Sequence, residues 1–454
     1  MKNFLKNLII GILQFEARLV LEKYKPKVIA VTGSVGKTST KEAIYAVLSK
    51  QTFVRKSEGR FDSSIGLPLC ILGQGSGGNN PLLWLGNIFK GMTLLLIRRA
   101  YPKWLILEVA VRKPRDMDKI VYWLKSDIVV VTRIGSVPSH VEFFKSVGDL
   151  VLEKGKLIKT LKKDGVLILN ADDSHALSLK NTSKNKVITF GFNEEANLVA
   201  SNSQILYGED SELDYSELGQ APKGIVFRVD SEGSSLPIMI EGAFGANHIY
   251  AGLAALAVSR VMGFNMVPAA QALRNYDLPP GRMRIIRGIK GTIIIDDSYN
   301  SSPLACESAL KILGEIKVSG PSTELGASKK IAVLGDMLEL GEHTDQAHKE
   351  IGKLVAKTAD ILVAVGVRAV NFAEGAMNHG MSEEKIYEFE DSRKAGKFLE
   401  SIIKKGDIIL IKGSQAVNME RAVEEIMANP ELKTDLLVRQ DERARIELSG
   451  RSPE

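Results

Sequence analysis

The stretch KVIAVTGSVGKTST (27–40) decides the fold of this 454-residue chain. Residues 27–33 are rich in β-branched side chains and predict a buried parallel strand that ends in a glycine turn. Residues 34–50 have the pattern of a helix. A strand, a glycine turn and a helix in this order indicate a loop whose backbone N–H groups bind a polyphosphate at the helix N-terminus.

The residue types of this loop indicate how the phosphates of a nucleotide are held. We expect Lys37 to reach the β- and γ-phosphates and the hydroxyl of Thr38 to bind Mg²⁺. The first glycine of the common G-x-x-x-x-G-K-[ST] pattern is replaced by Val31. The loop residues expected to contact nucleotide are Gly33, Ser34, Gly36, Lys37, Thr38 and Ser39.

Strand-like and helical segments alternate along the rest of the chain, which favours an α/β fold with parallel sheets. The expected strands of the first part are 104–111, 127–135 and 165–173, followed by a β-rich region (186–242) and a helix (246–263). Prolines at 279–280 mark a boundary, beyond which strands are expected at 291–298, 330–337, 359–366 and 406–414. We therefore predict a P-loop-type parallel-sheet ATPase domain at 26–278 and a smaller Rossmann-like α/β domain at 279–454. The charged tail from Asn429 is expected to be peripheral.

Composition excludes several classes of protein. Apolar residues make up 44% of the chain and charged residues 25%, as in globular proteins and unlike disordered ones. The net charge of +6 is modest for this length, and the sequence has no dense basic stripe like that of a nucleic-acid-binding protein. No nucleic-acid partner is therefore expected. Cys70 and Cys306 show no CxxC spacing, which favours a reducing cytoplasm.

The N-terminal residues 1–25 predict an amphipathic helix. Its longest uninterrupted apolar stretch, Leu8 to Leu13, is too short to span a bilayer. Helical spacing places a set of apolar residues on one face, namely Leu5, Leu8, Ile9, Ile12, Phe15 and Leu19. We favour packing of this face on the body of the protein, with peripheral contact to a membrane or another protein as the alternative.

Five segments of the chain resemble the Mur ligase family, which joins amino acids or peptides to a carboxylate using ATP. They are TGSVGKTST (32–40), PGRMR (280–284), DDSYNSSP (296–303), VLGDMLELGEHT (333–344) and KGSQAVNME (412–420). The resemblance covers about residues 27–440. It is closest to the branch that adds D-Ala-D-Ala to a UDP-MurNAc-tripeptide through an acyl phosphate, a reaction of peptidoglycan synthesis.

The resemblance implies a metal site with two Mg²⁺ ions. Glu108, at a strand end, matches a family glutamate that binds Mg²⁺, and His140 matches a histidine that helps hold a second ion. Lys154 in the frame EKGKLI matches a lysine that the family carbamylates to give a bridging anion. Together with Lys37 and Arg282, His140 and Lys154 are the expected catalytic residues.

The resemblance also implies contacts from the second domain. Arg282 is expected to reach the γ-phosphate and Asp297 the nucleotide ribose, while Tyr299 and Asn300 line the same cleft. The resemblance implies that Asn247 or His248 contacts the adenine, although the order of these two residues differs from the family pattern.

The early position of the phosphate loop, at residue 33, leads us to expect that the uridine-binding N-terminal domain of this branch is missing. Three alternatives stay open. The chain could resemble a folylpolyglutamate synthase, another Mur-type ligase, or a non-catalytic ATP-binding scaffold. The retained set of candidate site residues argues against the scaffold, and DDSYNSSP argues against the folate enzyme.

Overall fold

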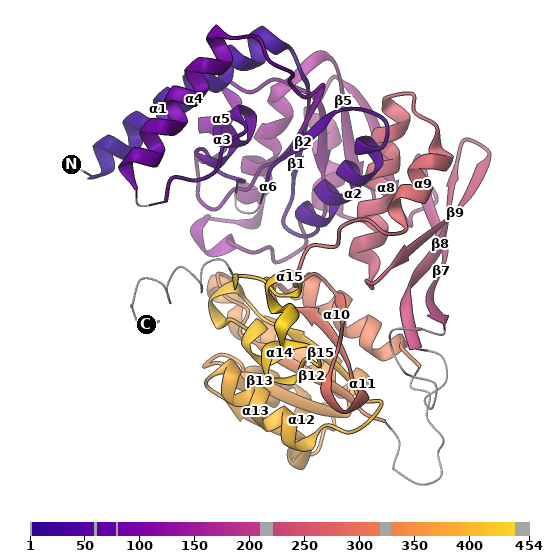
Figure 1. Ribbon diagram of the computed structural model, residues 1–454. Helices are drawn as coiled ribbons and strands as arrows, with labels where there is room; N and C mark the ends of the chain where they lie inside the picture. Colours follow the sequence, from indigo (N-terminus) through magenta and orange to yellow (C-terminus); the bar gives the residue numbers. More distant parts are fainter. Residues whose placement is uncertain (1, 59–60, 79, 209–220, 318–327, 441–454) are drawn as a thin grey trace.

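The computed structural model describes residues 2–58, 61–78, 80–208, 221–317 and 328–440. Two sheets organise these residues, one in the N-terminal part of the chain and one in the C-terminal part (Figure 1). Both sheets are dominated by parallel strands and carry helices on both faces, so the predicted α/β fold class is confirmed.

The N-terminal sheet has nine strands. In spatial order they are β2 (Val54–Lys56), β3 (Trp104–Glu108), β1 (Lys27–Thr32), β4 (Ser126–Val131), β5 (Leu161–Asn170), β6 (Lys186–Gly191), β7 (Leu198–Gly208), β8 (Ala221–Ser231) and β9 (Ser234–Glu241). Strands β2 to β7 pair in parallel, whereas β8 and β9 are antiparallel additions. The β-rich region expected at 186–242 therefore extends the same sheet.

Alternating side chains of the central strand β1 fill two different cores. Ile29 and Val31 pack in the cluster beneath α2 (Lys37–Ser49) and α8 (Ala246–Val261), while Val28 and Ala30 face the opposite cluster. The other helices of this part are α1 (Lys2–Tyr24), α3 (Gly66–Leu72), α4 (Pro81–Leu96), α5 (Asp118–Val121), α6 (Val147–Gly155), α7 (Ser174–Ser178) and α9 (Met266–Leu273). Because β1 is buried on both faces, it reads as a continuous apolar run.

The C-terminal sheet has six strands. Their order is β10 (Arg284–Arg287), β11 (Ile293–Asp297), β15 (Ile408–Lys412), β12 (Lys330–Gly335), β13 (Ile361–Val365) and β14 (Ile386–Phe389), with only β10 antiparallel. Its helices are α10 (Pro303–Glu315), α11 (Thr344–Thr358), α12 (Val370–Met377), α13 (Ser392–Ile402), α14 (Glu420–Ile426) and α15 (Lys433–Leu436).

Two expectations about the ends of the chain need correction. Helix α1 does pack on the body, but through Leu13, Ala17 and Val20, whereas Leu8 and Phe15 of the expected face are exposed. The tail is not wholly peripheral, because Leu437 is buried and Arg439 pairs with the buried carboxylate of Glu420. Residues 441–454 lie outside the described part.

Candidate active site at the phosphate loop

The phosphate loop joins β1 to α2 and is held against the end of β4. Gly33 has a φ of +143°, and a Cβ at this position would lie 2.0 Å from Oγ1 of Thr132. The N–H groups of Ser34 and Val35 both donate to the carbonyl of Arg133, at 2.8 and 3.0 Å. Gly36 (φ +88°) caps α2 in the left-handed region, where glycine carries no steric penalty. The loop thus presents Lys37 and Thr38 on the first turn of α2.

Glu108 lies beside this turn, at the end of β3, where strand register pairs it with Val31 of β1. The hydroxyl of Thr38 donates to Oε1 of Glu108 at 3.0 Å, and Oε2 lies 3.4 Å from Nζ of Lys41. Burial alone would raise the pKa of Glu108. The positive charges of Lys41, Lys37 and Arg282, with the Thr38 hydrogen bond, outweigh burial and lower that pKa. Glu108 is therefore a buried carboxylate kept ionised.

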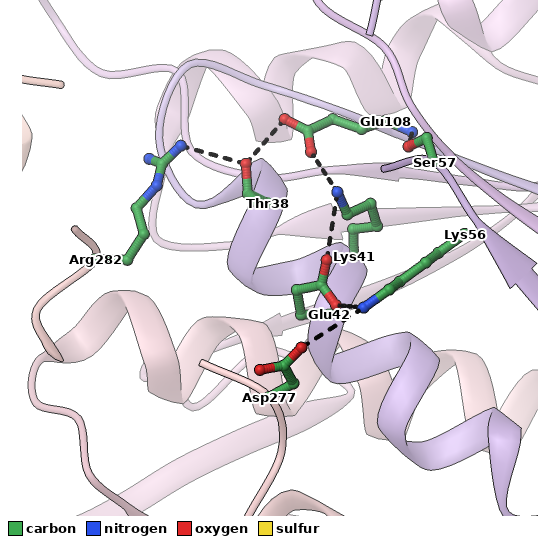
Figure 2. A network of polar contacts seen from close by, with 8 residues as sticks. All are labelled: Thr38, Lys41, Glu42, Lys56, Ser57, Glu108, Asp277 and Arg282. Carbon is green, nitrogen blue, oxygen red and sulfur yellow. Dashed lines mark hydrogen bonds and ion pairs between the residues drawn. The ribbon is translucent and has the colours of Figure 1, made fainter. Parts of the chain in front are cut away.

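A network of polar contacts runs along the same face of α2 (Figure 2). Lys41 lies 3.4 Å from Glu42, whose other carboxylate oxygen pairs with Lys56. Lys56 in turn lies 4.0 Å from the exposed Asp277, just before the expected domain boundary. Sequence reasoning missed Lys41 and Glu42, although their positions three and four residues after Thr38 put all three side chains on one helix face.

Arg282 reaches this network from the C-terminal part of the chain. Its Nη2 donates to the Thr38 hydroxyl at 3.2 Å, and its guanidinium lies 3.9 Å from the ring centroid of Tyr299. The buried Nε has no hydrogen-bond partner in the described part of the chain. A planar cation with an unused buried N–H beside the phosphate loop is suited to an incoming phosphate oxygen.

Asp297 is held by the C-terminal sheet. It is the register partner of Lys412 on the neighbouring strand, and the two side chains form an ion pair of 2.6 Å. Its other oxygen accepts from the N–H of Met283 at 3.2 Å. Burial raises the pKa of Asp297, although the Lys412 ammonium opposes this. Lys412 also donates to the carbonyl of Asn300 at 3.0 Å.

The two candidates for adenine contact differ in their surroundings. His248 is buried with both ring nitrogens engaged, one by the hydroxyl of Tyr276 and the other by the carbonyl of Arg282 at 2.8 Å. Burial lowers the pKa of His248 to about 4, so its ring is neutral near pH 7. Its contacts position the backbone of Arg282. Both Asn247 and His248 line the adjoining pocket.

Lys154, on α6, lies deep behind the phosphate loop. Its side chain is 2% exposed, and Nζ donates to the carbonyl of Gly33 at 3.1 Å. Burial and the nearby charge of Lys37 lower the pKa of Lys154 well below its ordinary value. Lys154 is therefore not a surface lysine, although it lies in a segment rich in charged residues.

His140 faces the C-terminal part of the chain. Its Nδ1 pairs with Oε2 of Glu339, and this hydrogen bond lowers the pKa of Glu339 despite burial. The contact links the loop after β4 to the segment 333–340. Within the described residues, no group of three or more His, Cys, Asp or Glu side chains is arranged to hold a metal ion.

A pocket opens between the two parts of the chain at this point. Its lining combines phosphate-loop residues with both ends of the predicted nucleotide site, namely Ser34, Val35, Gly36, Ser39, Ser139, Asn247, His248, Arg282, Met283, Asp297, Asn300, Ser301, Ser302, Ala305 and Lys412. Thr38 lies next to this pocket, because its hydroxyl contacts the pocket residue Arg282, and Glu108 contacts the same hydroxyl. Their hydroxyl and carboxylate oxygens are hard ligands, which fit Mg²⁺ when phosphate oxygens and water complete its shell.

Comparisons with known proteins agree with this geometry. Residues 31–258 match the family described as Mur ligase middle domain, and residues 281–415 match the family described as Mur ligase, glutamate ligase domain. The chain is 28% identical over 419 residues to the UDP-N-acetylmuramoyl-tripeptide–D-alanyl-D-alanine ligase of Bacillus subtilis, covering 92% of this chain and 79% of that protein. The enzyme of that name from Escherichia coli is 25% identical, covering 91% and 79%.

Solved structures show the same similarity in three dimensions. The MurF ligase of Thermotoga maritima in complex with ADP matches with a TM-score of 0.70 and 25% identity, covering 92% of this chain and 83% of that one. MurF of Acinetobacter baumannii gives a TM-score of 0.72 at 21% identity, covering 92% and 80%. A bifunctional folylpolyglutamate synthase/dihydrofolate synthase gives 0.57 at 14% identity, covering 89% and 92%, which shows a shared fold only.

Proposed function

The chain belongs to the Mur ligase family, and we propose on that basis that it is an ATP-dependent, ADP-forming ligase of peptidoglycan precursor synthesis. Its substrates are a UDP-N-acetylmuramoyl-tripeptide and D-alanyl-D-alanine, as the names of the Bacillus subtilis and Escherichia coli relatives state for those proteins. The observation that carries the proposal is the meeting of both parts of the chain at the phosphate loop, where Arg282 contacts Thr38 beside Glu108.

The chemistry joins two anions before an amine attacks. A carboxylate oxygen of the tripeptide attacks the γ-phosphorus of ATP, the bond to ADP breaks, and an acyl phosphate forms. The amino group of D-alanyl-D-alanine then attacks the carbonyl carbon and loses a proton, and inorganic phosphate leaves. Lys37 and Arg282 supply positive charge where these anions approach each other, which stabilises the charge of the transition state.

Mg²⁺ fits the oxygens of Thr38 and Glu108, which are 3.0 Å apart next to the phosphate loop. When bound, the ion polarises the phosphoryl group and screens its charge. Arg282 donates to the same hydroxyl, so it must turn from Thr38 toward phosphate when the metal is held. We also propose His140 for a second ion, which requires its ring to exchange Glu339 for that ligand.

Carbamylation of Lys154 is part of the proposal. The enclosed side chain is hydrogen-bonded at Nζ to Gly33, and burial together with the charge of Lys37 lowers the pKa of Lys154. A neutral amine there can attack CO₂: the N–C bond forms, an electron pair moves to oxygen, and the nitrogen loses a proton. The product carries one negative charge shared by two oxygens, which are ligands that Mg²⁺ prefers.

Nucleotide contacts are assigned to both parts of the chain. We propose that Asn247 meets the adenine, since His248 is engaged on both sides, and that Asp297 meets the ribose while Tyr299 and Asn300 border it. The division into domains at 26–278 and 279–454 is also a proposal, supported by the separation of the two sheets. Limited proteolysis tests it, because early cleavage confined to 104–173 would contradict that division.

The proposed location is the cytoplasm, where the two buried thiols Cys70 and Cys306 would stay reduced. We further propose that the N-terminal region makes a peripheral contact outside the reaction itself. Exposure of Leu8 and Phe15 on α1 supports such a contact.

Phosphate release from ATP tests the reaction. We expect release only when UDP-MurNAc-tripeptide and D-Ala-D-Ala are both present, and we expect Lys37→Ala to abolish it. Release with a folate and glutamate instead would establish the folate-type alternative. Binding of ATP without release in the presence of any acceptor pair would establish the scaffold.

A further inference from the structure

Exposed apolar side chains gather on the packed pair of helices α1 and α4. Nine of the eighteen large hydrophobic side chains exposed in the described part lie on these two helices or on Ile97, which directly follows α4. Five of them follow one another at alternating steps of three and four residues: Leu82, Leu85, Phe89, Met92 and Leu96. This spacing places them on one face of α4.

This face is distinct from the face that packs on the protein. Asn87 and Gly91 are buried in α4, and a Cβ at Gly91 would lie 2.2 Å from the Glu16 carboxylate of α1. Opposite them, Leu82 is 75% exposed, Phe89 67% and Leu96 80%. A continuous apolar stripe of this kind is uncommon on a protein that has no partner there.

The charge of the surrounding sequence indicates what covers the stripe. Residues 63–107 contain no aspartate or glutamate and four basic residues. Three of the basic residues, Lys90, Arg98 and Arg99, are exposed on α4 or directly after it. An apolar helix face whose own charged residues are all cations matches a surface of anionic headgroups over acyl chains.

We propose that α4, together with Leu8 and Phe15 of α1, lies flat on an anionic phospholipid surface. None of the helices described in the structure is long and apolar enough to cross a membrane. The two helices lie side by side at an outer edge of the N-terminal part, away from α12 and α13 (Figure 1). Contact there leaves the pocket at the phosphate loop open.

A second copy of the chain fits the stripe less well. Antiparallel pairing of two α4 helices would bring Arg98 and Arg99 of each copy to the positive N-terminal end of the other helix. Parallel pairing would bring the same cations together. Anionic lipid removes this repulsion, so it is the favoured occupant.

Vesicle flotation of the full chain tests the proposal. We expect the chain to float with phosphatidylcholine vesicles that contain phosphatidylglycerol, and to float less with pure phosphatidylcholine or at high salt. The double variant Leu85→Ser/Phe89→Ser should lower partitioning by roughly tenfold. The variant Arg98→Gln/Arg99→Gln should lose the preference for anionic vesicles.

A matched control is the pair Val367→Ser/Val370→Ser, because these side chains are also exposed but lie in the C-terminal part. This control should float like the unaltered chain, and all variants should keep its melting temperature. The proposal is overturned if the chain does not float, or if Leu85→Ser/Phe89→Ser floats normally. It is also overturned if sedimentation shows a dimer that this variant abolishes and no vesicle binding occurs.

Discussion

Arg282 and Thr38, 244 positions apart in the sequence, are joined by a 3.2 Å hydrogen bond between Nη2 and the threonine hydroxyl. This contact brings the segment that follows the proline boundary onto the first turn of α2. The same hydroxyl donates to Glu108, so one threonine links a proposed metal ligand to a proposed phosphate ligand.

Arg282→Gln should lower turnover by roughly 10²-fold, the scale of a lost transition-state contact. ATP binding, measured by calorimetry, should fall much less because the phosphate loop is intact. Arg287→Gln is the control, since Arg287 lies on β10 outside the pocket. Equal losses in the two variants would show that Arg282 acts only by supporting the fold.

Lys154→Ala should lower turnover by orders of magnitude, corresponding to roughly 3 kcal/mol or more of transition-state stabilisation. Short carboxylic acids should restore part of the rate by supplying the missing anion. Lys159→Ala, an exposed change nearby in the chain, should leave turnover unchanged.

A direct signal for the modified lysine comes from NMR with ¹³C-labelled bicarbonate. A carbamate resonance should be present in the unaltered chain and in Lys159→Ala, and lost in Lys154→Ala. Near-normal turnover of Lys154→Ala, or no resonance in the unaltered chain, would refute the carbamate.

Lys41→Met should destabilise the chain by roughly 3 kcal/mol, because it leaves the buried carboxylates of Glu42 and Glu108 with less compensating charge. Thermal unfolding measures this as a lower melting temperature. Lys50→Met, at the exposed end of the same helix, is the control. If both variants melt alike, Lys37 and Lys56 suffice to balance these carboxylates.

Glu16→Gln should show a stability effect that depends on pH. Burial raises the pKa of Glu16 to about 7, and its Oε2 lacks a hydrogen bond within the described residues. Because the folded pKa is raised, ionisation costs stability increasingly from about pH 4.5 to about pH 7. The melting temperature of Glu16→Gln relative to the unaltered chain should therefore rise between pH 5 and pH 8.

Each kcal/mol corresponds to roughly 2–4 °C in a large domain, so differential scanning fluorimetry can resolve the effect. Glu22→Gln on the same helix is the control, since Glu22 is exposed and paired with Arg18. A difference that stays constant with pH would show that Glu16 is already neutral at pH 8 or is solvated.

Sequence patterns predicted the strands well because buried β-branched runs leave few alternatives. The family resemblance grouped Lys37, Thr38, Glu108 and Arg282 in one predicted site, and in the structure Glu108 and Arg282 both contact Thr38. The buried face of α1 was predicted wrongly, because both faces of that helix are apolar and tertiary contact with α3 and α4 decides between them.

Pairings across long separations lay beyond sequence reasoning. The contact of His140 with Glu339 depends on how the two parts of the chain pack together. A local pattern of apolar residues carries no information about that packing. Arg439 was assigned to a peripheral tail on charge alone, yet it donates to the carbonyls of Ser298 and Tyr299 beside the pocket. Whether a charged side chain is buried can be predicted only when the position of its partner is known.

The position of β15 between β11 and β12 has a consequence for synthesis of the chain on the ribosome. β15 comes last among the strands, at 408–412, yet it lies inside the C-terminal sheet and supplies Lys412 to Asp297. Since chains emerge from the N-terminus and domains fold as units, the phosphate loop can be formed while its counterpart is still an incomplete sheet. A nascent chain that stalls before residue 408 would therefore carry a folded phosphate loop but only one side of the nucleotide pocket.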